Sequence, residues 1–133
     1  MSKEEQYKIK QDYYNEAMRY MANAKDTLKI AGKEDNHYID DKYVKTACGI
    51  AYNGVLKALD GYFIIKDIKR GKGRKSIEFY QNNISKIDKK LNSDVSNAYK
   101  ILHLSGYYDG VTNVRVINEG FELANNIIKK IEP

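Results

Sequence analysis

The stretch ACGIAYNGVLKALDGYFII, residues 47–65, decides the fold class. Its apolar residues recur three and four positions apart, which is the period of a helix packed along one face. With Val44, the stripe consists of Val44, Ala47, Cys48, Ala51, Val55, Ala58, Leu59 and Tyr62. Further apolar residues widen this surface, and a helix that is apolar on much of its circumference is buried by several neighbours. We therefore predict a central helix from about Asp40 to Lys69, capped by Asp40 or Asp41.

Three glycines interrupt this apolar pattern, at Gly49, Gly54 and Gly61. A glycine inside a helix costs up to ~1 kcal/mol relative to alanine. The compensation we expect is the close approach of another helix backbone, which small residues permit. The glycines therefore predict tight contacts on the central helix.

The same three- and four-residue spacing predicts further helices on both sides. The first runs from about residue 4 to 31 and stops at Gly32, and a polar connection follows at 33–41. Ser76 caps a third helix that reaches Leu91, and the segment 92–94 caps a fourth that ends near Gly106. Thr112 or Asn113 caps the last helix, whose stripe is Val114, Ile117, Phe121, Ala124, Ile128 and Ile131.

No segment shows sustained alternation with a period of two, so we predict no sheet. Helices of these lengths joined by short loops pack as an antiparallel bundle. The fold prediction is an all-α, antiparallel four- to five-helix bundle that forms a single helical domain over residues 1–133. Ile117 and Phe121 are predicted to be buried in its core.

Composition and cysteine content indicate an ordinary globular protein in a reducing compartment. The chain is 42% apolar and 31% charged, which is typical of globular rather than disordered chains. The single cysteine, Cys48, lies in the apolar stripe and is interpreted as a small buried side chain. We find no signal peptide and no apolar run long enough to span a membrane, so a cytoplasmic location is expected.

The net charge of +5 is concentrated in one short segment, residues 66–75. Its basic residues are Lys66, Lys69, Arg70, Lys72, Arg74 and Lys75, against Asp67 alone. Clustered Lys and Arg neutralise phosphates, so Lys69, Arg70, Lys72, Arg74 and Lys75 are candidate contacts for nucleic acid or another anion. The alternative is a solvated loop that keeps the protein soluble. Both interpretations stay open here.

Residue types and spacings offer little catalytic apparatus. The only histidines are His37 and His103, and neither has a Cys or a second His at metal-ligand spacing. No metal and no cofactor are therefore expected. His103 precedes Tyr107 by four residues, and with Tyr108 and Asp109 it forms a possible polar cluster. The alternative for this cluster is a helix end that packs tyrosines.

The residues 47–63 resemble the second helix of HEPN domains, with small residues followed by a Lys-Ala-Leu step. The segment 102–109 and the helix through Ala124 to Ile131 resemble the last two helices of the same superfamily. The resemblance covers most of the chain from about Asp12. The whole chain also resembles a small family of Bacteroidetes proteins.

The HEPN resemblance implies a helical bundle that often dimerises. Many HEPN domains are ribonucleases that carry an Arg, four to six residues, and then a His, and others are partner subunits of nucleotidyltransferases. No Arg stands at that distance before His37 or His103. The resemblance therefore implies a binding or regulatory role. We expect a non-enzymatic interaction module that homodimerises or docks on a protein partner such as a nucleotidyltransferase, with a nucleic-acid-binding or degenerate ribonuclease-like protein as the alternative.

Overall fold

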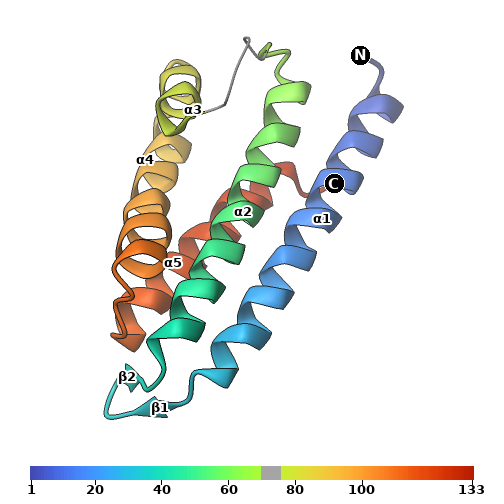
Figure 1. The fold of residues 1–133 in the computed structure, drawn as a ribbon. Helices are drawn as coiled ribbons and strands as arrows, with labels where there is room; N and C mark the ends of the chain where they lie inside the picture. Colours follow the sequence, from blue (N-terminus) through green and yellow to red (C-terminus); the bar gives the residue numbers. More distant parts are fainter. Residues whose placement is uncertain (70–75) are drawn as a thin grey trace.

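The computed structural model describes residues 1–69 and 76–133, and the fold within them is a helical bundle (Figure 1). Its α-helices are α1 (Lys3–Ile30), α2 (Asp41–Ile65), α3 (Ile77–Ile84), α4 (Lys89–Ala98) and α5 (Val114–Ile128). Helix α4 continues directly into a π-helix, η1 (Tyr99–Tyr108), and a short 3₁₀ turn, η2 (Lys129–Ile131), follows α5. The predicted all-α bundle is confirmed.

Helix α2 lies at the centre of the bundle, as its apolar pattern predicted. It runs antiparallel to α1 on one side, and α4 with η1 lies on the other (Figure 1). Helix α5 packs against α2, α4 and η1. The whole predicted stripe of α2 is buried.

Polar caps set where several helices begin. The Asp40 side chain accepts a hydrogen bond from the amide of Lys42 at the start of α2. Ser76 and Asn113 accept from amides in the first turns of α3 and α5. These N-caps agree with the sequence predictions. The C-terminal end of α2 does not, because the helix ends at Ile65, four residues before the predicted Lys69.

The prediction of no sheet was wrong in one detail. The polar connection after α1 contains a small antiparallel hairpin of β1 (Lys33–Glu34) and β2 (His37–Tyr38). Asp35 and Asn36 both adopt positive φ, at 50° and 67°, as the two central residues of a tight hairpin turn do. Asp and Asn tolerate this conformation, so the turn signal was present in the sequence.

The boundary between the third and fourth helices was also predicted wrongly. Helix α3 ends at Ile84, and Asp88 is the cap of α4, where its carboxylate accepts from the Leu91 amide at 2.9 Å. The predicted interruption at 92–94 lies inside α4. There the buried Asp94 forms an ion pair with Lys90 one turn earlier, at 2.8 Å, which stabilises a polar residue in mid-helix.

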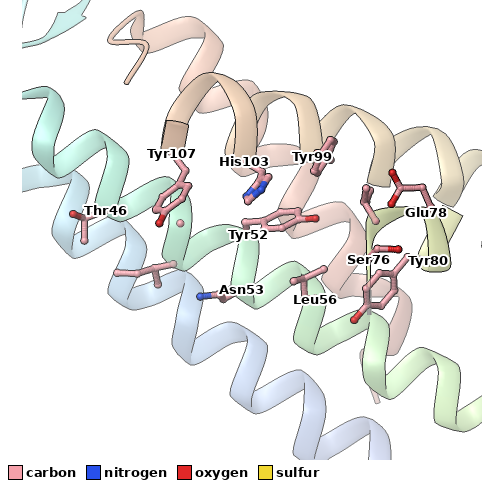
Figure 2. Close-up of a pocket in the computed structure, with 13 residues that line it drawn as sticks. Thr46, Tyr52, Asn53, Leu56, Ser76, Glu78, Tyr80, Tyr99, His103 and Tyr107 are labelled. Atoms are coloured by element: carbon pink, nitrogen blue, oxygen red, sulfur yellow. The ribbon is translucent and has the colours of Figure 1, made fainter. Parts of the chain in front are cut away.

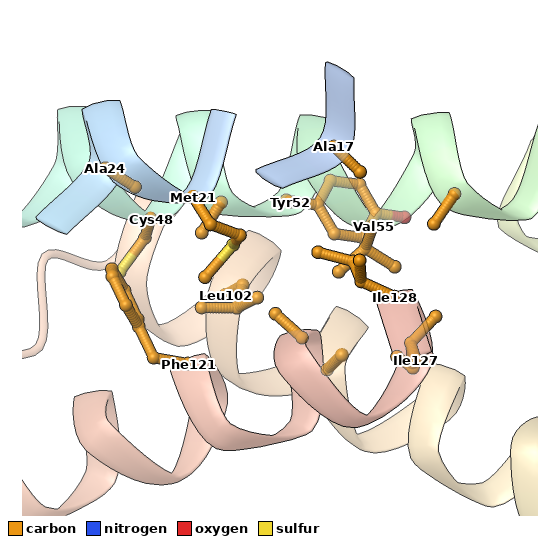
Figure 3. Packing of buried hydrophobic residues seen from close by; sticks show 14 of the residues in the cluster. Ala17, Met21, Ala24, Cys48, Tyr52, Val55, Leu102, Phe121, Ile127 and Ile128 are labelled. Carbon is orange, nitrogen blue, oxygen red and sulfur yellow. The ribbon is translucent and has the colours of Figure 1, made fainter. Parts of the chain in front are cut away.

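The core lies where α1, α2, η1 and α5 meet (Figure 3). Ile117 and Phe121 are 0% and 7% exposed, so the predicted register of α5 is confirmed. Cys48 is fully buried, and burial raises the pKa of its thiol to about 12. The interpretation of Cys48 as a small buried side chain is therefore confirmed.

The glycines of α2 mark its closest helix contacts. A Cβ atom on Gly61 would lie 2.6 Å from the Cβ of Tyr13 on α1. One on Gly49 would lie 2.9 Å from the Tyr107 ring of η1. The expected tight contacts are present, although side chains rather than a helix backbone make them at Gly61 and Gly49; at Gly54, a Cβ atom would lie 3.3 Å from the backbone carbonyl oxygen of Ala17. These contacts fix the spacing between α2 and its two neighbours. Among the described residues, none of the helices has the length and apolar character needed to cross a membrane.

Candidate functional site

The π-helix η1 arranges histidine and tyrosine side chains into a single aromatic cluster. A π-helix is bonded from each residue to the fifth one along, and such segments frequently occur at functional sites. Its wide turn brings both Tyr107 and Tyr108 against His103, with ring centroids 5.8 and 5.0 Å away. Tyr99, one turn earlier, stacks on the other side of the imidazole at 5.2 Å.

Helix α2 adds a fourth tyrosine ring to the cluster. The Tyr52 ring lies 4.9 Å from His103 and 6.0 Å from Tyr99. Two close contacts hold α2 against η1 at this point: Gly49 faces Tyr107, and Gly106 faces Cys48. His103 therefore contacts four tyrosine rings, and we call these five residues the His103 cluster.

The side chains of Tyr99, His103 and Tyr107 form one wall of a groove with a volume of about 720 Å³ (Figure 2). The opposite wall is the outer face of α2, and the start of α3 lies at one end. A volume of this size falls in the ~300–1,000 Å³ range of small-molecule sites. We call this hollow the aromatic groove; its described lining is Thr46, Gly49, Ile50, Tyr52, Asn53, Leu56, Ser76, Ile77, Glu78, Tyr80, Tyr99, His103 and Tyr107.

Burial keeps His103 and Tyr52 in their neutral forms. Desolvation lowers the pKa of His103, so the imidazole is uncharged at neutral pH and offers one donor and one acceptor nitrogen. Desolvation also raises the pKa of Tyr52, and the nearby hydroxyl of Tyr99 and carboxylate of Glu78 raise it further. The Tyr52 hydroxyl is therefore protonated and able to donate.

The groove has polar groups that are free to meet a ligand. Within residues 1–69 and 76–133, no hydrogen bond reaches either ring nitrogen of His103. The Asn53 carboxamide lies at the groove and is exposed (Figure 2). Among the residues that the structure describes, no carboxylate orients the imidazole, as one does in a catalytic triad. In the described part of the chain, no three metal-ligating side chains come together.

The structure brings together only part of the predicted polar cluster. His103, Tyr107 and Tyr108 are in contact, as their spacing predicted. Asp109 is exposed at the end of η1, and it forms no ion pair or hydrogen bond with His103 in the described residues.

The predicted basic contacts lie largely beyond what the structure describes. Lys69 is exposed shortly after the end of α2. Arg70, Lys72, Arg74 and Lys75 lie outside the described residues. Ser76, which follows them in sequence, lines the aromatic groove. The described part of the chain therefore resumes at one end of the groove.

Sequence reasoning missed Tyr52 and Tyr99 as members of the site. Tyr99 stands four residues before His103, a spacing that could have placed both on one helix face. Tyr52 comes from another helix, so no local spacing could reveal it. The available signal was the glycines of α2, which predicted a close helix contact without identifying η1 as the partner.

The fold and the groove define a helical-bundle protein with an aromatic groove between α2 and a π-helix. The chain belongs to the family described as a domain of unknown function (DUF5618), which matches residues 12–133. A solved structure, a protein of unknown function from Dyadobacter fermentans, is similar with a TM-score of 0.85 and 46% sequence identity, over 92% of this chain and 95% of that one. No curated protein matches the chain.

Proposed function

We propose that the protein is a non-catalytic interaction module that self-associates through η1, in a HEPN-like bundle. The single observation that carries this proposal is the exposed apolar face at the end of η1. Leu104, Tyr107 and Tyr108 are 38%, 45% and 62% exposed there. Tyrosine is enriched at protein interfaces, because it combines a large apolar ring with a hydroxyl that can find a partner.

The chemistry of the aromatic groove supports binding rather than catalysis. His103 and Tyr52 are neutral, and His103 has no carboxylate partner in the described residues that would make it a strong base. The Cys48 thiol, with its raised pKa, is buried away from solvent and is a poor nucleophile. A cytoplasmic location suits such a free thiol.

The resemblance to HEPN domains supports the choice of a second copy as the partner. Those domains often dimerise, and the missing Arg before His103 favours members that bind rather than cleave. Docking on another protein, such as a nucleotidyltransferase, is the competing outcome. Solution mass distinguishes the two, because only self-association doubles the mass of the purified chain.

We expect sedimentation equilibrium at tens of micromolar to give the mass of a dimer. Changing Leu104 and Tyr108 together to Ser should shift the equilibrium to monomer, because both side chains are exposed and their loss removes apolar contact area. The folded state should be retained, since neither residue belongs to the buried core.

A matched control changes Ile30 and Ile87 together to Ser. These two residues are also large, apolar and exposed, but they lie away from η1. This control should remain dimeric. A parent protein that sediments as a monomer would contradict the proposal, and so would a Leu104/Tyr108 variant that dimerises as tightly as the parent.

A second candidate function is nucleic-acid binding, and the position of Ser76 favours it. The basic stretch 66–75 ends immediately before this groove-lining residue, and the groove also contains Tyr99 and Tyr107, whose rings stack on His103. Bases of single strands stack on aromatic side chains, while Lys and Arg bind the backbone. This candidate would correspond to a degenerate HEPN ribonuclease that retains RNA binding.

For this second candidate, we expect binding to single-stranded RNA to fall steeply as salt rises, because cationic contacts release counterions. Changing Lys72, Arg74 and Lys75 together to Ser should weaken binding to all sequences and flatten the salt dependence. Fluorescence anisotropy with labelled oligonucleotides measures both effects. A parent protein that binds neither single- nor double-stranded nucleic acid at low salt would eliminate this candidate.

A further inference from the structure

A second hollow lies between the end of α1, the β1–β2 hairpin and α5. Its volume is about 460 Å³. The apolar floor consists of Leu28, Tyr38 and Phe121, all of which belong to the buried core. We call it the basic hollow, because lysine side chains stand at its rim. It shares no lining residue with the aromatic groove.

Three lysines stand around this apolar floor. Lys25 and Lys29 are four residues apart on α1 and so share one face of that helix. Lys33 comes from the hairpin, and its ammonium group lies 5.7 Å from the centre of the Tyr38 ring. In the described residues none of the three forms an ion pair. Glu122 is the single carboxylate among the lining residues.

Helix α5 completes the rim with two carboxamides. Asn118 and Asn125 line the hollow beside Phe121, and neither side chain is hydrogen-bonded within the described residues. An amide can donate to an anionic oxygen. The rim therefore presents an excess of donors and of positive charge around an apolar base, which is the arrangement typical of small-molecule sites.

The walls of the basic hollow are fixed by backbone hydrogen bonds. The Tyr38 amide donates to the Thr112 carbonyl at 2.8 Å, and the Val114 amide donates to the Asn36 carbonyl at 2.9 Å. These bonds tie the hairpin to the start of α5. The Ile39 amide donates to the Gly32 carbonyl at 2.9 Å and ties it to the end of α1. The hollow is thus formed before a ligand enters, which lowers the entropic cost of binding.

We propose that the basic hollow binds a small amphipathic anion, with its apolar body on Leu28, Tyr38 and Phe121 and its carboxylate or phosphate head among the lysines. The apolar floor favours a ligand with an apolar body, because an inorganic anion would leave the floor residues in contact with water. The lysine ammonium groups favour a negatively charged head, since their three positive charges exceed the single negative charge of Glu122. This site is independent of the aromatic groove and of self-association.

The test follows backbone amide signals in NMR spectra while sodium octanoate is added below its micelle concentration. We expect saturable shifts confined to the ends of α1 and α5 and the hairpin. Octanol and inorganic phosphate should each bind more weakly than octanoate, because each lacks one half of the recognised chemistry. Octyl phosphate in place of octanoate then shows which headgroup the lysines prefer.

Changing Lys25 and Lys29 together to Gln should weaken octanoate binding on the order of fivefold, given the modest contribution of each exposed ion pair. The control changes Lys3 and Lys8 to Gln, because these exposed lysines stand at the other end of α1 and the net charge falls equally. The control should bind as the parent does. Equal weakening in both variants, octylammonium binding as tightly as octanoate, or the absence of saturable shifts in the hollow would each overturn the proposal.

Discussion

Replacing Phe121 with Ala is expected to lower the free energy of unfolding by about 3–5 kcal/mol, the cost of truncating a buried aromatic ring. Phe121 is 7% exposed, and its side chain extends from α5 toward Cys48 of α2 (Figure 3). Helix α5 cannot move in to fill the space, because Gly120 already packs against Ile101 and Leu102 of η1. Urea denaturation followed by circular dichroism measures the loss.

The matched control for Phe121 is Tyr108→Ala, which removes an aromatic side chain of similar size from an exposed position. It should change the free energy of unfolding by less than about 1 kcal/mol, as surface substitutions do. If Phe121→Ala melted within a degree or two of the parent, the assignment of this side chain to the core would be wrong. Measurements at one low protein concentration keep self-association from contributing to the difference.

Periodicity predicted the helices whose apolar stripes are long and unbroken. The patterns of α2 and α5 predicted their type and their buried faces and narrowed each N-cap to two neighbouring residues, because an amphipathic helix and its capping residue are encoded within a few turns. Short helices carry fewer repeats. The segment 76–98 was therefore divided at its polar residues 92–94, when the true boundary is the cap at Asp88. Asp94 resembles a cap in sequence and acts as a partner for Lys90 in the structure.

The candidate site was only partly predictable from the sequence, because part of it depends on how α2 and η1 pack against each other. The spacing of His103 and Tyr107 gave their shared face. The π-helical backbone, which brings Tyr108 to the same imidazole, has no signature in residue spacing alone. Tyr52 reaches His103 because glycines allow α2 and η1 to approach, so its role is a property of the tertiary structure.

The close contact between α2 and η1 can be tested at Gly106, where we expect substitution by Ala to destabilise the protein. A Cβ atom here would lie 2.6 Å from the Cβ of Cys48, nearer still to its sulfur, and 3.2 Å from the Ile101 carbonyl oxygen. Cys48 is fully buried and cannot turn away. Overpacking of this kind costs about 1–3 kcal/mol. Alanine favours a helix over glycine by only ~1 kcal/mol, so the steric cost should prevail.

Gly54→Ala is the matched control on α2, because the added Cβ atom would be less crowded than at Gly106. It would lie 3.2 Å from the Cβ of Tyr20 and 3.3 Å from the Ala17 carbonyl oxygen. Its smaller overlap should leave the free energy of unfolding within about 1 kcal/mol of the parent, since helix propensity offsets part of the crowding. In a Cys48→Ala background the loss caused by Gly106→Ala should shrink, because the sulfur has gone. A Gly106→Ala protein as stable as the parent in chemical denaturation would mean that η1 lies farther from α2. The assignment of η1 as a wall of the aromatic groove would then be wrong.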